Sequence, residues 1–138
     1  MPDKNMAMFW TAAVIILITD QITKSLIRSK LIIGESAGLI TRVENTGVAF
    51  GMFTDANWIF AVIALIVIVM LIVHRKKFEM AISALGAGLI LGGASGNLMD
   101  RILFGAVTDF ISIGWWPAFN VADASLTFGV ILLLLWQR

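Results

Sequence analysis

The sequence contains no cysteine and a single histidine, His74. The lack of cysteine excludes a disulfide framework, a thiolate metal site and a cysteine nucleophile, and one histidine cannot build a histidine metal site. We therefore expect neither a metal ion nor a cofactor. Charged residues are also scarce, at 14% of the chain, and the formal net charge of +1 indicates neither a nucleic-acid partner nor an acidic substrate.

Apolar residues dominate the chain instead. They make up 59% of the 138 residues, and the mean hydropathy is +0.95. Residues 9–18, 58–73 and 131–136 run with almost no charge. A soluble domain of this length buries only part of its apolar side chains, so this composition predicts a protein whose solvent is a lipid bilayer.

Four apolar segments approach the roughly 20 residues that a membrane-spanning helix needs. They lie at about 8–27, 57–73, 80–98 and 118–136, with outer loops at 28–56 and 99–117. We predict one all-α integral-membrane domain, residues 1–138, with four transmembrane helices. The first segment lacks a small-x-small cleavage site at its end, so we interpret it as an uncleaved span rather than a secretory signal.

The densest basic cluster, residues 74–77, lies between the second and third segments. The positive-inside rule places this short loop in the cytoplasm, which puts both chain termini there as well. Lys4 and Arg138 agree with this orientation, whereas Arg28, Lys30 and Arg42 in the first outer loop reduce the charge asymmetry.

The outer loops carry signals of their own. Residues 31–33 and 39–43 have strand-like composition around the glycine-containing stretch 34–38, which predicts a small extracytoplasmic β-hairpin or sheet between the first two helices. Indole rings favour the membrane interface, where Trp115 and Trp116 would lie. Pro117 suits the start of the fourth helix.

Ionisable residues inside the predicted spans need a partner or a purpose, because each costs about 2.5 to 3.5 kcal/mol on insertion scales. Asp20 and Lys24 lie four residues apart on one face of the first helix, which predicts an ion pair. The pair could be purely structural or could also contribute to a binding site.

The third segment combines small and polar residues. Residues 92–96 predict a surface on which another helix packs closely, and they lack the lysine and hydroxyl residue of a phosphate loop. Asn97, Asp100 and Arg101 follow on one face. They either anchor the helix end, or Arg101 holds a carboxylate or a peptide carbonyl.

Asp109 and Asp123 lie in otherwise apolar runs at the same predicted outer depth. Either residue alone would be interpreted as a helix cap or an interfacial carboxylate. Together they form a candidate pair that holds one proton between two carboxyl groups, so that one activates water and the other hydrogen-bonds a scissile carbonyl. Asn120 lies three residues before Asp123 and can orient its carboxylate.

Three alternatives remain at this point. Ser95, Ser112 or Ser125 could act as a nucleophile if Lys24 served as its base. A small proton-coupled transporter could use the acidic residues and Lys24 as a relay, although four helices without repeats suit alternating access poorly. A structural scaffold would leave the clustered acidic residues without a reason.

The sequence resembles the lipoprotein signal peptidases, bacterial signal peptidase II, over nearly its whole length. Five segments in the same order carry the resemblance: Asp20 with Lys24; Asn45-Thr46-Gly47-Val48-Ala49-Phe50; residues 92–101; Val107-Thr108-Asp109-Phe110; and Phe119-Asn120-Val121-Ala122-Asp123.

The resemblance implies an aspartic endopeptidase of the bacterial cytoplasmic (inner) membrane that removes signal peptides from diacylglyceryl-modified prolipoproteins and is inhibited by globomycin-type peptides. Asp109 and Asp123 would be its catalytic pair near the outer leaflet. The residues implied to support the site or position the substrate are Asp20, Lys24, Asn45, Gly47, Asn97, Arg101 and Asn120. We expect a monomer in contact with membrane lipid. Residues 48–53 could shield the substrate from water.

Overall fold

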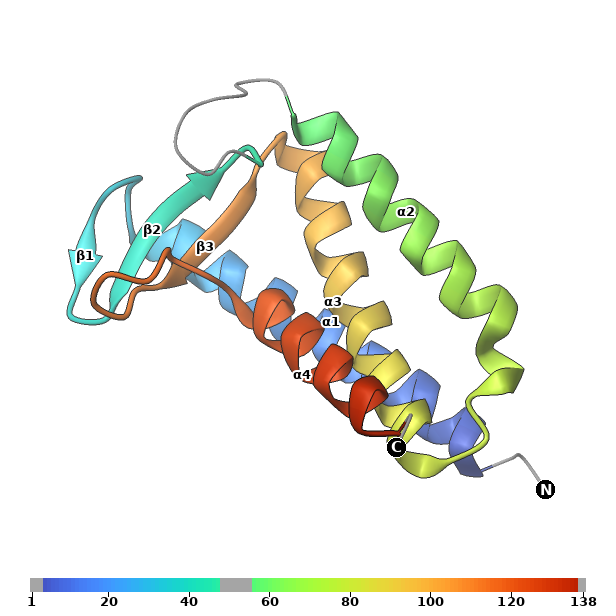
Figure 1. The fold of residues 1–138 in the computed structure, drawn as a ribbon. Helices are drawn as coiled ribbons and strands as arrows, with labels where there is room; N and C mark the ends of the chain where they lie inside the picture. Colours follow the sequence, from blue (N-terminus) through green and yellow to red (C-terminus); the bar gives the residue numbers. More distant parts are fainter. Residues whose placement is uncertain (1–3, 48–55, 137–138) are drawn as a thin grey trace.

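The computed structural model describes residues 4–47 and 56–136, so the predicted cover at 48–53 lies outside the described residues. Its elements are α1 (Lys4–Lys30), β1 (Ser36–Ala37), β2 (Ile40–Asn45), α2 (Asn57–His74), the 3₁₀ helix η1 (Arg75–Lys77), α3 (Ala81–Phe104), β3 (Val107–Ile111) and α4 (Val121–Trp136). The four helices form a bundle with a small sheet at one end (Figure 1). This confirms the predicted fold class.

Three of the described helices are long and apolar enough to cross a membrane. The spans at 4–30, 57–77 and 81–104 have mean hydropathies of 1.6, 2.6 and 1.4. The most apolar of them, which includes α2, has no residue of its span window buried inside the protein, as expected for side chains that contact lipid. The fourth helix, α4, is apolar but has only 16 residues.

The fourth helix begins later than predicted. Pro117 was expected to start it, but Phe119 forms a β-bridge with Ile111. The backbone N–H of Ile111 donates to the carbonyl of Phe119 at 2.8 Å, and the carbonyl of Asn120 accepts from the N–H of Ala124 at 3.2 Å. Phe119 therefore pairs with the end of β3 instead of lying in the helix, and α4 starts at Val121.

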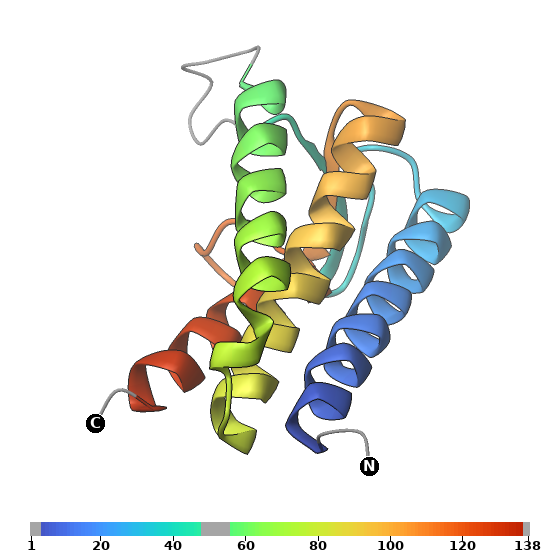
Figure 2. The same cartoon turned by 90° about the vertical axis from the view of Figure 1, so that its right-hand side faces the viewer.

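Helix α3 packs against α1, α2 and α4 (Figure 2). Small residues make two of these contacts close. A Cβ atom added to Gly92 would lie 2.6 Å from the carbonyl oxygen of Ala13 in α1, and one added to Gly93 would lie 2.6 Å from that of Ala122 in α4. The predicted small-residue surface therefore lets two helices approach α3 from different sides.

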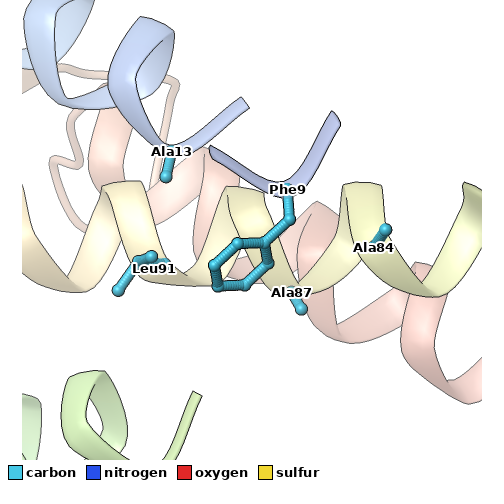
Figure 3. Packing of buried hydrophobic residues seen from close by; sticks show 5 residues of the cluster. All are labelled: Phe9, Ala13, Ala84, Ala87 and Leu91. Carbon is cyan, nitrogen blue, oxygen red and sulfur yellow. The ribbon is translucent and has the colours of Figure 1, made fainter. Parts of the chain in front are cut away.

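A hydrophobic cluster joins α1 and α3 near the N-terminal ends of both helices. It consists of Phe9, Ala13, Ala84, Ala87 and Leu91, and Figure 3 shows the ring of Phe9 lying between the two helices. The ring also stacks on a second aromatic ring, that of Phe78 just before α3, with 6.1 Å between the centroids. This cluster secures the end of the bundle opposite the sheet.

Replacing Gly92 with leucine should lower the free energy of unfolding by about 1 to 3 kcal/mol, because the added side chain has no room against Ala13. Thermal unfolding in detergent would measure this. The matched control is Ala81→Leu, at the exposed start of the same helix. Equal melting temperatures for Gly92→Leu and the wild type would contradict the close packing of α1 on α3.

The sheet has the order β1-β2-β3, and both strand pairs are antiparallel. The predicted strand at 31–33 is wrong. Leu31 still donates a helical hydrogen bond to Ile27, and Gly34 adopts a φ of +84°, which turns the chain before Ser36. The third strand, β3, comes from the loop between α3 and α4, so the sheet joins both predicted outer loops.

The two ends of the bundle differ in chemistry. The N-terminal end of α1, η1 and the C-terminal end of α4 lie together at one end, and the sheet lies at the other (Figure 1). Three consecutive basic residues, Arg75, Lys76 and Lys77, form η1. The sheet end therefore carries β3 and the start of α4, the two elements that hold Asp109 and Asp123.

Candidate active site

Asp109 projects from the central part of β3 and is only 2% exposed. Each of its carboxylate oxygens accepts one amide hydrogen bond. Asn45 Nδ2 donates to Oδ2 at 3.0 Å, and Asn120 Nδ2 donates to Oδ1 at 2.7 Å. Strand β2 and the start of α4 therefore hold this carboxyl group from two sides.

Asp123 lies at the third position of α4, where its side chain completes a reciprocal cap. The backbone N–H of Asp123 donates to Asn120 Oδ1 at 2.8 Å, and the backbone N–H of Asn120 donates to Asp123 Oδ2 at 3.2 Å. This is a capping box in which Asn and Asp replace the usual Ser and Glu. The other carboxylate oxygen, Oδ1, accepts from Asn97 Nδ2 of α3 at 2.9 Å.

Asn120 connects the two carboxyl groups. Its amide nitrogen donates to Asp109 while its amide oxygen and backbone nitrogen bond Asp123, and the residue itself is fully buried. The Asn120 amide also donates to Asn97 Oδ1 at 3.2 Å. The helix cap and the orientation of the acidic pair thus depend on the same side chain.

The surroundings of Asp109 raise the pKa of its carboxyl group. Burial, and then the negative charge of Asp123, raise the pKa of Asp109 to about 7, while the hydrogen bonds from Asn45 and Asn120 and the positive charge of Lys24 act in the opposite direction. Near neutral pH, Asp109 can therefore hold a proton that an ordinary aspartate would have lost.

Lys24 forms the predicted ion pair with Asp20, at 2.7 Å, and both side chains are completely buried. It also lies 3.1 Å from Asp100 Oδ2 and donates to Asn97 Oδ1 at 2.9 Å. An ammonium group has three hydrogens, and these three acceptors can use all of them. Lys24 is therefore poorly suited to act as the base of a serine nucleophile.

Asp20 also reaches α4. Its Oδ1 atom accepts the backbone N–H of Ala122 at 2.9 Å, so a carboxylate from α1 bonds one of the free donors in the first turn of α4. A Cβ atom added to Gly96 would collide with the Asp20 carboxylate, which explains the glycine at this position. The buried cluster around Lys24 therefore supports the start of the helix that carries Asp123.

Asp100 lies at the end of the third predicted segment, but the sequence did not predict that it belongs to the cluster around Lys24. It is fully buried, pairs with Lys24, and accepts the backbone N–H of Thr108 in β3 at 3.1 Å. The sequence alone suggested only that Asp100 could anchor the end of the helix. Its position in an apolar helix was the available signal, since a charge there needs a partner.

Arg101 holds no carboxylate from the described part of the chain, although a carboxylate was one of the two partners that the sequence allowed. Among the described residues no carboxylate lies within 4.0 Å of its guanidinium, because Asp100 turns toward α1 and pairs with Lys24 and Arg28 instead. The Arg101 group lies over the ring of Phe60, 5.5 Å from its centroid, and remains within electrostatic reach of Asp123 and Asp109. It is thus a cation beside the acidic pair without an ion-pair partner in residues 4–47 and 56–136.

Gly47 contributes through Asn45. Its backbone N–H donates to Asn45 Oδ1 at 2.8 Å, which leaves the amide nitrogen of Asn45 facing Asp109. Gly47 has a φ of +95°, and an added Cβ atom would collide with Phe60. A glycine is therefore required here on two grounds.

A groove of about 510 Å³ opens beside Asp123 along α4. Its lining is mainly apolar and consists of Trp116, Pro117, Ala118, Phe119, Asp123, Ala124, Thr127 and Phe128. Within the described part of the chain, no three acidic or histidine side chains converge as metal ligands would. The site is therefore a pair of carboxyl groups held by three asparagines, with a cation and an apolar groove next to it.

Comparisons with known proteins agree on one family. Residues 12–137 match the family model described as signal peptidase (SPase) II. The chain is 41% identical to a lipoprotein signal peptidase of Syntrophomonas wolfei, covering 92% of this chain and 90% of that protein. It is 39% identical to one of Halothermothrix orenii, covering 95% and 97%.

Solved structures show the same similarity. A bacterial membrane enzyme determined by the in meso method at 1.9 Å resolution superposes with a TM-score of 0.82 at 34% identity, covering 92% of this chain and 90% of the other. A second such structure, at 2.3 Å resolution, has a TM-score of 0.81 at 34% identity and covers 92% and 85%.

Proposed function

The chain belongs to the signal peptidase II family, and from this we propose that it is an aspartic endopeptidase that cleaves the signal peptide from diacylglyceryl-modified prolipoproteins. The observation that carries the aspartic mechanism is the single asparagine that bonds both carboxyl groups. Asn120 lies between Asp109 and Asp123 and orients each of them. This arrangement supports two acidic residues that act as one unit.

We assign the acid role to Asp109 and the base role to Asp123. The pKa of about 7 lets Asp109 donate a hydrogen bond to the scissile carbonyl near neutral pH. Asp123 takes a proton from the attacking water, which adds to the carbonyl carbon and forms a tetrahedral intermediate. Collapse of that intermediate breaks the C–N bond, and the leaving amine receives a proton from the pair. No acyl-enzyme forms on this route.

The remaining residues have supporting roles in this proposal. Asn45, held by Gly47, orients the carboxyl group of Asp109. Asn97, held by Lys24, orients that of Asp123. Arg101 binds a backbone carbonyl of the substrate in this proposal, since no described carboxylate pairs with it and its NH1 bond to the carbonyl of Asn97, at 3.4 Å, leaves other N–H donors. The apolar groove beside Asp123 suits an apolar part of the lipid-modified precursor.

We place the enzyme in the bacterial cytoplasmic membrane as a monomer with both termini in the cytoplasm. The basic helix η1, the N-terminal end of α1 and the C-terminal end of α4 lie at one end of the bundle, which the positive-inside rule assigns to the cytoplasm. The sheet and the acidic pair lie at the opposite end, near the outer leaflet. Globomycin-type peptides should inhibit the enzyme by occupying this site.

The deciding experiment compares cleavage of a diacylglyceryl-modified precursor with cleavage of the same precursor without the lipid. We expect the purified protein to cleave only the modified form efficiently. The products are separated by gel electrophoresis and the cut site is identified by mass spectrometry. Equal cleavage of both forms would contradict the proposed lipid dependence, and cleavage of neither would contradict the peptidase function.

The rate of cleavage should depend on the proton on Asp109. Because its pKa is raised to about 7, kcat/KM should fall as the pH rises above about 7 and Asp109 loses its proton. Initial rates in a series of buffers from about pH 5 to about pH 9 would define this limb. Glu35→Gln, which removes an exposed carboxylate in the outer loop, should leave the profile unchanged. A flat profile above pH 7 would contradict the acid role of Asp109.

A further inference from the structure

The strand pair β2–β3 has a second polar face, opposite the acidic pair. Glu44 lies opposite Thr108, and Asn45 lies opposite Val107. Because side chains alternate along a strand, Asn45 and Asp109 share one face while Glu44 and Thr108 share the other. Thr108, the neighbour of Asp109 in sequence, therefore makes its side-chain contacts on the face opposite the acidic pair.

Thr108 is completely buried, and all of its polar groups are bonded. Its hydroxyl accepts from Arg28 NH1 at 3.0 Å and lies 3.2 Å from Glu44 Oε2, to which it donates. Its backbone N–H donates to Asp100 Oδ2 at 3.1 Å, and its carbonyl accepts from Asn120 Nδ2 at 3.4 Å. These contacts join β3 to α1, β2, α3 and the start of α4 through one residue.

The contacts on this face close into a ring through Arg42. Its Nε atom bonds Glu44 Oε1 at 3.0 Å, and its NH1 atom donates to the backbone carbonyl of Arg28 at 3.1 Å. The side chains of Arg28, Arg42 and Glu44 are each only 18% exposed. Their hydrogen bonds involve charged groups shielded from much of the solvent, so they are stronger than surface ion pairs.

This ring matters because the strand register decides which face Asp109 occupies. A shift of one residue would exchange the two faces and turn Asp109 away from Asp123. The main-chain pairing of β2 with β3 is short and is interrupted between Ile40 and Val43. The side-chain hydrogen bonds at Thr108 therefore help to fix the register of β2 and β3, which the short and irregular main-chain ladder fixes only weakly.

We propose that Arg28 and Glu44 are positioning residues for Asp109 and act through the hydroxyl of Thr108. The proposal rests on the peptidase function proposed above. Arg28 and Glu44 bond the face of β3 opposite Asp109, so they hold the carboxyl group in place rather than contribute to its chemistry.

The first test replaces Thr108 with valine, which has nearly the same shape but no hydroxyl. With the lipid-modified precursor as substrate, kcat/KM should fall about tenfold, mainly through kcat, because a small displacement of a catalytic group is costly. Thr108→Ser keeps the hydroxyl and should stay within about twofold of the wild type. Thr41→Val is the matched control. It removes a hydroxyl that bonds Ser36 of β1 at 2.8 Å, and it should have no effect.

The pH profile separates positioning from mere stability. Asp109 interacts with Asp123 from α4, Lys24 from α1 and Arg101 from α3, and Asp123 raises its pKa. If Thr108→Val lets Asp109 move away from Asp123, the limb near pH 7 should shift to lower pH. A variant that only unfolds more easily would lose active enzyme without changing this profile.

A double-mutant cycle tests whether the residues act through Thr108. Arg28→Gln and Glu44→Gln should each lower kcat/KM, and adding either to Thr108→Val should cause little further loss. Independent, multiplying losses would overturn the proposal, as would a folded Thr108→Val with wild-type kcat and pH profile. If Thr108→Val does not fold, the two glutamine variants are judged by the same criteria. Failure of the wild type to cleave would instead count against the peptidase function.

Discussion

Asp109→Asn and Asp123→Asn should each reduce cleavage of the lipid-modified precursor by about 10²–10⁴-fold, the range that a positioned general acid or base contributes. An amide at either position has nearly the same shape as the carboxyl group but cannot exchange a proton with water or with the leaving amine. Single-turnover rates with enzyme in excess would measure the loss without interference from product release.

The same two variants should remain folded. Asp109 and Asp123 are bonded mainly to neutral asparagine and backbone groups, so an amide loses or strains about one hydrogen bond, worth about 1 kcal/mol. Thermal unfolding in detergent would verify this, with Glu35→Gln as a carboxylate-to-amide control remote from the pair. A folded Asp109→Asn protein that cleaves at the wild-type rate would refute the aspartic mechanism.

Lys24→Met should lower the free energy of unfolding by about 3 to 5 kcal/mol, the cost of breaking a buried ion pair from one side. Methionine fills most of the space, but it leaves the buried carboxylates of Asp20 and Asp100 without their shared cation. Asn97 also loses the donor to its amide oxygen. We expect a lower melting temperature and a smaller yield of folded protein from membranes.

The control for Lys24→Met is Lys30→Met, the same substitution at the exposed end of α1. It should melt like the wild type. Adding Asp100→Asn to Lys24→Met should recover part of the loss, because it removes one of the two buried carboxylates that Lys24 neutralised. A Lys24→Met protein with wild-type stability would mean that the buried cluster does not hold α1, α3 and α4 together.

Much of the fold could be predicted because a lipid bilayer permits few backbone structures. In a bilayer the backbone must satisfy its own hydrogen bonds, so long apolar segments form helices, and the four predicted segments correspond to α1 to α4. The ion pair of Asp20 and Lys24 was equally accessible, since residues four apart on a helix are neighbours. Both predictions need only local spacing.

Contacts between distant segments could not be predicted in the same way. The pattern around 31–43 indicated a hairpin, but the partner of β2 that matters for the site is β3, more than 60 residues later. Asp100 and Arg101 are adjacent in sequence and oppositely charged, yet Asp100 pairs with Lys24 and Arg28 while Arg101 has no carboxylate partner among the described residues. Which of two neighbouring side chains finds an oppositely charged partner depends on how α1 packs against α3.

The amino-acid sequence alone was enough to predict that this chain spans a membrane, to exclude cysteine chemistry, and to select Asp109 and Asp123 as a candidate acidic pair. How the pair is held depends on packing, which brings Asn45, Asn97 and Asn120 to it from three different parts of the chain. The reason is physical. Apolar composition and helical spacing are local properties, whereas the orientation of a carboxyl group depends on donors that packing brings together.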